Sequence, residues 1–412
     1  MKSRQHLPLL GALMSLVPVT IDAYLPALPL LERDFGSTTT FVQYSVMACL
    51  LGSATGQLFV GSISDSYGRR PTLFWGLSLF TLASLACAWA PSITIFLVLR
   101  FIQGITSSVG TVMSRAVVRD LLDGNSAARA YSALMIIMGV APIVSPIIGS
   151  TLLGFASWRS IFYFLAFFGL LLISLVLITL PETLPKERRI PTNRAAKREA
   201  RNLVFQDPLF RMSVLASAFV NGTLLVYLST STFALQRQFN ISPQLFSILF
   251  AANSLGIVAA GQSNRRLLLN FGPATMLRFG CAWGAFWGLL LAIYSHTHQP
   301  RLWITVALLL LTMSTIGFAF ANCIALATHH HAARAGTAAG YFGASQTFLG
   351  AIFAVGANAV SATFTGMAYE LFIPMAMAAI VIIPFLPRYA PTFVRATNSG
   401  SVSSGVGSKS SS

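Results

Sequence analysis

The sequence predicts an all-α membrane protein with twelve transmembrane helices in two pseudo-symmetric six-helix bundles. The chain of 412 residues is 55% hydrophobic and only 9% charged, whereas soluble domains carry about a quarter charged residues. Apolar stretches of about 20 residues, which can cross a bilayer core of about 30 Å, recur along the whole chain. The period-two alternation that is typical of outer-membrane β-barrels is absent. Together these observations indicate a polytopic α-helical membrane protein.

The apolar stretches are separated by polar loops and indicate twelve helices. The first stretch follows Lys2 and Arg4. It is too long for the apolar region of a signal peptide, so we interpret it as a retained helix. The predicted helices cover residues 7–30, 41–63, 72–90, 93–115, 130–154, 159–180, 209–233, 244–264, 273–295, 301–327, 335–360 and 367–387.

A basic polar segment divides the helices into six plus six. Two short similarities recur across it: AARA at 127–130 and 332–335, and Tyr67-Gly68 matching Phe271-Gly272. Similarities at nearly one offset, at equivalent points of a six-helix unit, indicate a duplicated architecture. The predicted domains are an N-terminal bundle (1–180), a cytoplasmic basic linker (181–208), a C-terminal bundle (209–390) and a disordered Ser/Gly-rich cytoplasmic tail (391–412).

The formal net charge of +16 is explained by where the basic residues lie. With a cytoplasmic N-terminus, 22 of the 27 Lys and Arg residues fall at cytoplasmic ends or loops. This bias follows the positive-inside rule, so the charge indicates topology, with both termini cytoplasmic, and not a nucleic-acid-binding surface. The five exceptions are Arg33, Arg159, Arg237 and Arg301 outside, and Arg100 within the membrane.

Metal and enzyme chemistry have no support in the sequence. The run His329–His331 lies on a predicted cytoplasmic loop without a neighbouring Cys or acid, and adjacent side chains do not converge on one ion. We therefore interpret it as a solvated loop. The zinc-protease, phosphate-loop and serine-nucleophile motifs are absent. Four cysteines lie within apolar stretches at no metal-like spacing and are expected to be buried free thiols: Cys49, Cys87, Cys281 and Cys323.

The stretch VTIDAYLPALP at residues 19–29 places Asp22 inside an apolar helix. Tyr227 occupies the equivalent position of the second half. Asp22 and Arg100 are both expected about 10–12 Å below the outer surface, at 1.5 Å per residue. We assign the other ten acids to the outside (Glu32, Asp34, Glu370) or the inside (Asp65, Asp120, Asp123, Glu182, Glu187, Glu199, Asp207), which leaves Asp22 as the only carboxylate in the hydrocarbon region.

An ionisable residue inside the membrane is costly and is functional by default. We predict that Asp22 carries a proton and that Arg100 tunes it, because desolvation favours the neutral carboxyl group and a nearby guanidinium favours the charged one. No nucleotide-binding or metal motif is present, so we expect no cofactor and a proton gradient as the energy source. Two alternatives stay open: a static Asp22–Arg100 ion pair that only fixes packing, and snorkelling of Arg100 to the interface.

The loop GSISDSYGRRP at residues 61–71 is a candidate conformational latch. Gly61 and Gly68 allow a tight turn and a close helix approach. Asp65 can cap a helix end or pair with Arg69 or Arg70. The alternative is a positively charged turn with a helix cap.

Helix 5 carries two prolines and two glycines in GVAPIVSPIIGS, residues 139–150. Pro142 and Pro146 are expected to bend the helix, while Gly139 and Gly149 permit close packing. The alternative is a packing kink without further function.

The predicted substrate pocket combines polar residues expected near mid-membrane with larger, adaptable side chains. The alternative is ordinary interhelical hydrogen bonding. Few charges in the cavity suggest a neutral, zwitterionic or weakly cationic amphipathic compound. The candidate residues are Tyr44, Ser107, Ser108, Met135, Met138, Asn221, Tyr227, Asn253 and Gln346.

Several of these motifs resemble those of a known family. The loop at 61–71 resembles the cytoplasmic signature of the major facilitator superfamily, and LRFIQG at 99–104 resembles its helix 4 motif. The stretch at 19–29 and the Ala-Pro-x-x-x-Pro-x-x-Gly form of helix 5 resemble the bicyclomycin-resistance (Bcr/CflA) drug exporters. The resemblance implies the major facilitator fold, an arginine at position 100 that influences proton transfer, and a latch through Asp65 and Arg69 that locks the halves in the outward-facing state.

We therefore expect a non-enzymatic, proton-coupled antiporter that exports small amphipathic compounds across the bacterial inner membrane by alternating access. Its expected partners are a small-molecule substrate, protons and the lipid bilayer, without nucleic acid, and the expected state is a monomer. One alternative is an exporter dedicated to a natural metabolite such as a siderophore or nucleoside. Another is an uncoupled channel or sensor with the same fold.

Overall fold

The computed structural model describes residues 6–122, 124–185, 187, 202–358 and 363–386. This part of the chain is helical and contains no strand, which confirms the all-α class. It has eleven helices long and apolar enough to cross a membrane, and one of them, with 52 residues, bends into two spans. The predicted tail at 391–412 and most of the predicted linker lie outside the described residues.

The described elements follow one another in the chain as a series of long helices with short breaks. They are α1 (Leu7–Met14), α2 (Leu16–Asp22), η2 (Leu25–Ala27), α3 (Leu28–Phe35), α4 (Thr39–Tyr67), α5 (Arg69–Ala88), α6 (Ile93–Leu121), α7 (Gly124–Phe155), α8 (Arg159–Thr179), α10 (Pro208–Phe239), α11 (Pro243–Tyr294), α12 (Leu302–Met313), α13 (Thr315–Thr328), η4 (His329–Arg334), α14 (Ala335–Asn358) and α15 (Phe364–Phe385).

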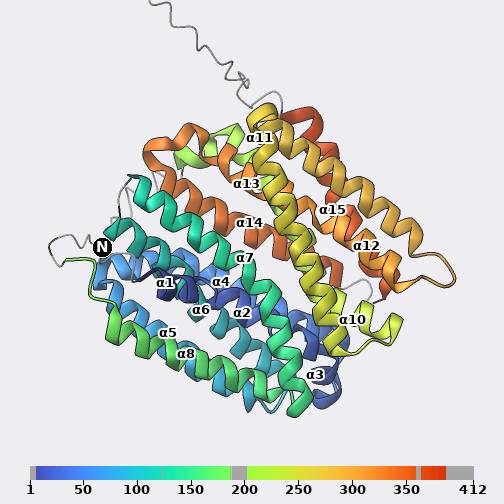
Figure 1. Ribbon diagram of the computed structural model, residues 1–412, viewed down its shortest axis with the longest axis horizontal. Coiled ribbons are helices and arrows are strands. Elements are labelled where there is room, and N and C mark those ends of the chain that lie inside the picture. The colour runs from blue at the N-terminus through green and yellow to red at the C-terminus, as the bar shows by residue number, and fades with distance from the viewer. Residues whose placement is uncertain (1–5, 123, 186, 188–201, 359–362, 387–412) are drawn as a thin grey trace, which may run out of the picture.

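Two groups of helices lie side by side in Figure 1, the blue-to-green group at the lower left and the orange-to-red group at the upper right. Between the groups, α4 packs against α10 and α14, and α7 packs against α11. We call the end of the molecule at Gly68 and Pro208 the linker end, and the opposite end, at the turn of Gly36, the Gly36 end. The domain boundaries proposed from the sequence stay predictions.

Two glycines mark equivalent points of the two halves. Gly68 separates α4 from α5 with φ 104° and ψ 163°, and Gly272 bends α11 with φ 72° and ψ 163°. Positive φ favours glycine because it has no Cβ. The sequence predicts a loop between helices 8 and 9, but the helix continues through it as α11, with Pro273 after the bend. Gly61 lies within α4 and is half-buried.

Small residues bring helices of the first half into close contact. A Cβ on Gly52 of α4 would overlap the carbonyl of Phe101, and a Cβ on Gly104 of α6 would overlap the carbonyl of Cys49. Such small residues let helix backbones approach inside a membrane, where burial against lipid gives little driving force. The packing of α4 on α6 fixes the position of Arg100, one residue before Phe101.

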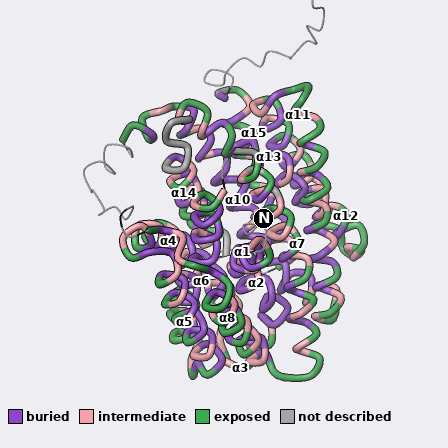
Figure 2. The backbone as a smooth tube through the Cα atoms, turned by 60° about the vertical axis from the view of Figure 1, so that its left-hand side comes forward, coloured by how far each residue is buried: buried purple, intermediate pink, exposed green. Residues whose placement is uncertain are grey.

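The interior is apolar with scattered polar side chains. Figure 2 shows buried residues throughout both halves and more exposed positions on edge helices such as α5 and α12. The four cysteines are free and buried, as predicted. A single large cluster of buried hydrophobic residues includes side chains from both halves.

Candidate functional site

Asp22 lies at a break in the first transmembrane segment. The sequence predicts one helix over residues 7–30, but the segment is divided into α1, α2, η2 and α3 and continues to Phe35. Pro26 has no N–H to donate to the Asp22 carbonyl, which prevents a regular helix there. Asp22 is the last residue of α2 and is only 4% exposed. Because the segment is longer than predicted, Asp22 lies near the middle of the 29-residue span, deeper than expected.

Arg100 is fully buried in α6 and contacts the backbone of this break. Its Nη1 and Nη2 atoms donate to the Thr20 carbonyl at 3.3 and 3.4 Å. Nη1 also donates to Gln103 Oε1, and the guanidinium lies 4.1 Å from the centroid of the Tyr24 ring. Among the described residues, no ion pair joins Arg100 to Asp22. The static ion pair and the snorkelling arginine that the sequence leaves open are therefore both absent from this conformation.

Further hydrogen bonds hold Tyr24 and Gln103, two of the groups that contact Arg100. The Tyr24 hydroxyl bonds to Ser45 Oγ of α4 at 3.0 Å. Gln103 Nε2 of α6 donates to Ser84 Oγ of α5 at 2.8 Å. A guanidinium can stack on an aromatic ring while its N–H groups donate hydrogen bonds within the guanidinium plane. Arg100 therefore links the Tyr24 ring and Gln103 to the backbone of the broken segment.

Helix α7, which carries the predicted motif at 139–150, approaches the same break. A Cβ on Gly149 would overlap the carbonyl of Ala23, the residue after Asp22. A Cβ on Gly139 would lie 3.6 Å from its nearest neighbour, which is an ordinary contact. Both predicted prolines, Pro142 and Pro146, lie inside α7. Of the two glycines in the predicted motif, only Gly149 is required for this close approach.

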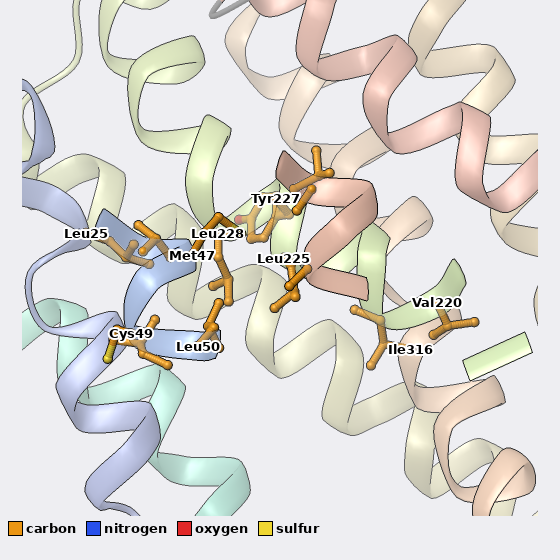
Figure 3. Packing of buried hydrophobic residues seen from close by; sticks show 14 of the residues in the cluster. Leu25, Met47, Cys49, Leu50, Val220, Leu225, Tyr227, Leu228 and Ile316 are labelled. Carbon is orange, nitrogen blue, oxygen red and sulfur yellow. The ribbon is translucent and has the colours of Figure 1, made fainter. Parts of the chain in front are cut away.

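Tyr227 of α10 lies on the side of the second half that faces the broken segment (Figure 3). The element that follows Asp22, η2, packs against α10, the helix that carries Tyr227. Asn253 Nδ2 donates to the Tyr227 hydroxyl at 3.1 Å, and the Tyr227 ring stacks on Phe250 with a centroid distance of 5.4 Å. In Figure 3 the oxygen of Tyr227 points toward the side on which Leu25 lies. The two equivalent positions noted in the sequence therefore lie on elements that face each other at the junction of the halves.

Two other predicted pocket residues contact each other within the second half. Asn221 Nδ2 of α10 donates to the Gln346 carbonyl of α14 at 3.3 Å, and Ser217 Oγ donates to Gln346 Oε1. These bonds join two helices of one half. They match the alternative of ordinary interhelical hydrogen bonding.

The remaining predicted pocket residues are dispersed. Ser107 and Ser108 are buried and donate to carbonyls of their own helix at 2.8 and 2.7 Å. Met135 is 53% exposed, whereas Met138 is partly buried against the core. Tyr44 is partly buried beside Phe41. Direct contacts within the predicted set are thus seen for the pairs Tyr227–Asn253 and Asn221–Gln346.

An ion pair and two hydrogen bonds join the halves at the Gly36 end, and a third hydrogen bond supports them from within the first half. Arg237 of α10 pairs with Glu32 of α3 and donates to Thr39 Oγ1 of α4 at 3.0 Å. Thr39 in turn donates to Glu32 Oε1 at 2.8 Å. The neighbouring Gln236 donates through Nε2 to the Pro26 carbonyl at 3.2 Å. This network, which we call the Gly36 gate, is therefore attached to the broken segment that carries Asp22.

A second contact between the halves joins α7 to α11. Gln244 Nε2 donates to the Ser150 carbonyl at 3.2 Å, and Ser247 Oγ donates to the Pro146 carbonyl at 2.9 Å. Hydrogen bonds thus join the halves both at this contact and at the Gly36 gate. The conformation is therefore closed at the Gly36 end.

The predicted latch forms an ion-pair network inside the first half. Arg69 is 2% exposed and donates to Asp65 Oδ1 at 2.7 Å and to Asp120 Oδ2 at 2.8 Å. The backbone N–H groups of Arg69 and Arg70 donate to Glu182 at 2.9 and 3.2 Å. The Asp65–Arg69 pair is confirmed, and Asp120 and Glu182 are additions that the structure makes. These partners belong to the first half and to the start of the linker, so locking of the two halves stays a prediction.

Two expectations about charged residues are wrong. Glu370 was assigned to the outside, but it lies within α15 and is 6% exposed, so Asp22 is not the only buried carboxylate. The histidine run was expected to have no neighbouring acid. His330 Nδ1 and His331 Nε2 each lie 3.1 Å from Asp207 Oδ2, because Asp207 caps the start of α10 nearby. Among the described residues, no group of three or more His, Cys, Asp or Glu is arranged to hold a metal ion.

Sequence reasoning missed several groups that hold the site. The Thr20 carbonyl gives no sequence signal, since every residue has a carbonyl. Glu32 and Arg237 were counted only for topology, although two opposite charges assigned to the same face of the membrane were a usable signal for an ion pair. Tyr24 adjoins the break as one of few polar residues in an apolar stretch, and this was the available signal for its role.

Comparison with known proteins gives consistent matches across the chain. The sequence profile of the Major Facilitator Superfamily matches residues 10–355. A Bacillus subtilis protein described as an uncharacterized MFS-type transporter, YdgK, is 36% identical over 87% of this chain and 90% of its own length. A Haemophilus influenzae bicyclomycin resistance protein homolog is 30% identical over 92% of this chain and 94% of its own length.

A more distant relative and a solved structure agree with these matches. An Escherichia coli protein named multidrug resistance protein MdtL is 26% identical over 92% of this chain and 95% of its own length. The crystal structure of a D-xylose–proton symporter superposes with a TM-score of 0.76 at 15% identity and covers 95% of this chain and 98% of that one. At that identity the superposition supports the fold alone, and it confirms the predicted architecture.

Proposed function

The chain belongs to the Major Facilitator Superfamily, and we propose that it is a proton-coupled antiporter that exports small amphipathic compounds by alternating access. The protein is a multi-pass membrane protein. One observation carries the proposal. Asp22 is a buried carboxyl group at the middle of a broken segment, and among the described residues it has neither a hydrogen bond nor an ion pair.

Such a carboxyl group can take up and release a proton as its surroundings change. Desolvation favours the neutral acid, so Asp22 holds a proton while the Gly36 end is closed over it. Water that enters from an opened end favours the carboxylate and the release of that proton. Arg100 is occupied by Thr20 and Tyr24, so it acts in this scheme by fixing the break and not by neutralising the acid.

The Gly36 gate links this proton step to opening of the end. Gln236 donates to Pro26, four residues after Asp22, while its neighbour Arg237 pairs with Glu32. Opening the gate must break these bonds. The part of the broken segment that follows Asp22, η2 and α3, is then released from α10. Opening of the Gly36 end and access of water to Asp22 therefore occur together.

The exported compounds are proposed from the relatives and from the composition of the candidate pocket. Two relatives carry names that refer to bicyclomycin or multidrug resistance. The candidate pair Tyr227 and Asn253 offers a hydroxyl and an amide, which suits neutral or weakly cationic amphipathic molecules. In this scheme the proton gradient supplies the energy without a cofactor, the protein works as a monomer in the bacterial inner membrane, and both termini face the cytoplasm.

Everted membrane vesicles test the proposal. When vesicles with an acidic lumen receive bicyclomycin or ethidium, the wild-type protein should release protons from the lumen as it transports the compound inward. Asp22→Asn should abolish both the proton release and the uphill transport. Glu370→Gln is the matched control, because it neutralises the other buried carboxylate and should leave coupling intact. Uphill transport by Asp22→Asn at the wild-type rate would falsify the role of Asp22.

A further inference from the structure

Gln43 of α4 is a buried amide without a hydrogen-bond partner. Its side chain is 0% exposed, and neither Oε1 nor Nε2 bonds to any described residue. Buried polar groups are nearly always paired, and an exception calls for an explanation. The position of Gln43 supplies one.

The face of α4 that carries Gln43 is turned toward the second half. Gly52 packs against α6, and at 100° per residue Gln43 lies about 180° around the helix from it. Thr39, one turn nearer the Gly36 end, bonds to Arg237 of the second half. Leu50, on the same face but deeper, belongs to the apolar contact between α4 and α10 that Figure 3 shows. Gln43 is thus held between the Gly36 gate and this apolar contact.

The duplicated architecture offers a direct comparison. Ser247 of α11 occupies the position equivalent to Gln43, at the offset that relates Gly68 to Gly272. Ser247 bonds to the Pro146 carbonyl across the α7–α11 contact between the halves. Gln43 makes no such bond at the matching contact of α4 with α10 and α14. One of two equivalent contacts between the halves therefore closes over an unpaired amide.

We propose that Gln43 is a binding residue for the exported compound in the conformation that is open at the Gly36 end. There the amide is uncovered, and it donates to and accepts from a neutral polar group of the compound, such as an amide or hydroxyl. The amide of Gln43 is uncharged and has both donors and an acceptor, so it suits a neutral polar ligand group better than it suits a cationic one. This role rests on the proposed export function. It also explains why the amide is left unpaired when the end closes.

The first measurement is the ratio of closed to open conformations at the Gly36 end. Spin labels at the exposed positions Arg33 and Gln238 report the distance across this end, and the buried native cysteines leave these sites free for labelling. Gln43→Leu removes the unpaired amide from the closed contact and should raise the closed-to-open ratio at least about fivefold. Thr305→Val is the matched control. Thr305 Oγ1 is also buried and unpaired, but α12 packs against α11 and α13 and not at the junction of the halves, so the ratio should not change.

Binding of bicyclomycin is the second measurement, made in an Arg237→Glu background in which two acids face each other at the gate and favour opening. There Gln43→Leu should weaken binding about fivefold or more, while Thr305→Val should change it less than twofold. An unchanged closed-to-open ratio, or a changed ratio with unchanged binding, overturns the proposal. If the wild-type protein neither binds nor exports bicyclomycin or ethidium, the proposed function fails and the ligand role of Gln43 fails with it. The spin-label result would then still decide whether Gln43 opposes closure.

Discussion

Arg100 donates both of its Nη groups to the backbone carbonyl of Thr20, two residues before Asp22. A cation that is held by the backbone of a broken helix determines the shape of the break. The arginine thus sets the position of the acid without forming an ion pair with it.

This contact predicts that lysine cannot replace Arg100. Lysine keeps the charge but lacks the planar fork that bonds to Thr20 while it stacks on Tyr24. Arg100→Lys should lower uphill export in everted vesicles at least tenfold and destabilise the protein by about 1–3 kcal/mol through unpaired buried groups, measured by thermal unfolding in detergent. Wild-type export by the lysine variant would show that charge alone is sufficient.

The Gly36 gate predicts a charge-swap result. Arg237 is half exposed, so its pair with Glu32 is worth about 0.2–1 kcal/mol. Arg237→Gln should lower the closed-to-open ratio, measured with spin labels at Arg33 and Gln238, by up to about fivefold, and high salt should reduce this difference. The double variant Glu32→Arg/Arg237→Glu should recover most of the ratio. A swap that behaves like a single variant contradicts the role of the ion pair.

The two glycines of the α7 motif, Gly139 and Gly149, should differ in how strongly substitution by alanine affects stability and export. Gly149→Ala forces a Cβ against the carbonyl of Ala23 beside Asp22, and overpacking of this kind costs about 1–3 kcal/mol. Gly139→Ala meets only an ordinary contact and should leave thermal unfolding nearly unchanged. We expect export to fall with Gly149→Ala and to persist with Gly139→Ala. Equal effects would mean that the motif acts through helix bending and not through this close approach.

The ion-pair network of the latch predicts that its two acids, Asp65 of the loop and Asp120 of α6, have separable effects. Asp120 is 12% exposed and is the more shielded partner of the buried Arg69. Asp120→Asn removes this partner's charge, so it should lower the free energy of unfolding by about 3 kcal/mol. Asp65 is 48% exposed, so Asp65→Asn should cost less than about 1 kcal/mol. If Asp65 also locks the halves, as the motif implies, Asp65→Asn should reduce export far more than stability. Thermal unfolding and vesicle transport measured together distinguish the two effects.

The sequence predicted the helices well because membrane spans require a length of apolar residues that can be counted along the chain. It failed where a continuous apolar stretch contains a break, as in the first segment, and where a helix continues through polar residues, as at Gly272. Glu370 was misplaced because α15 begins at Phe364, three residues before the predicted start, so the acid lies within the helix and is buried by the protein.

By itself the sequence determined the class, the twelve spans, the duplication and the position of Asp22, because composition and spacing are properties of the chain alone. The tertiary structure decided which groups meet. It brought Arg100 to the Thr20 carbonyl, Asn253 to the Tyr227 hydroxyl, and Arg237 to Glu32 across the junction of the halves. The physical reason is that these contacts depend on side-chain direction and on backbone groups of helices distant in the chain, and no local pattern specifies them.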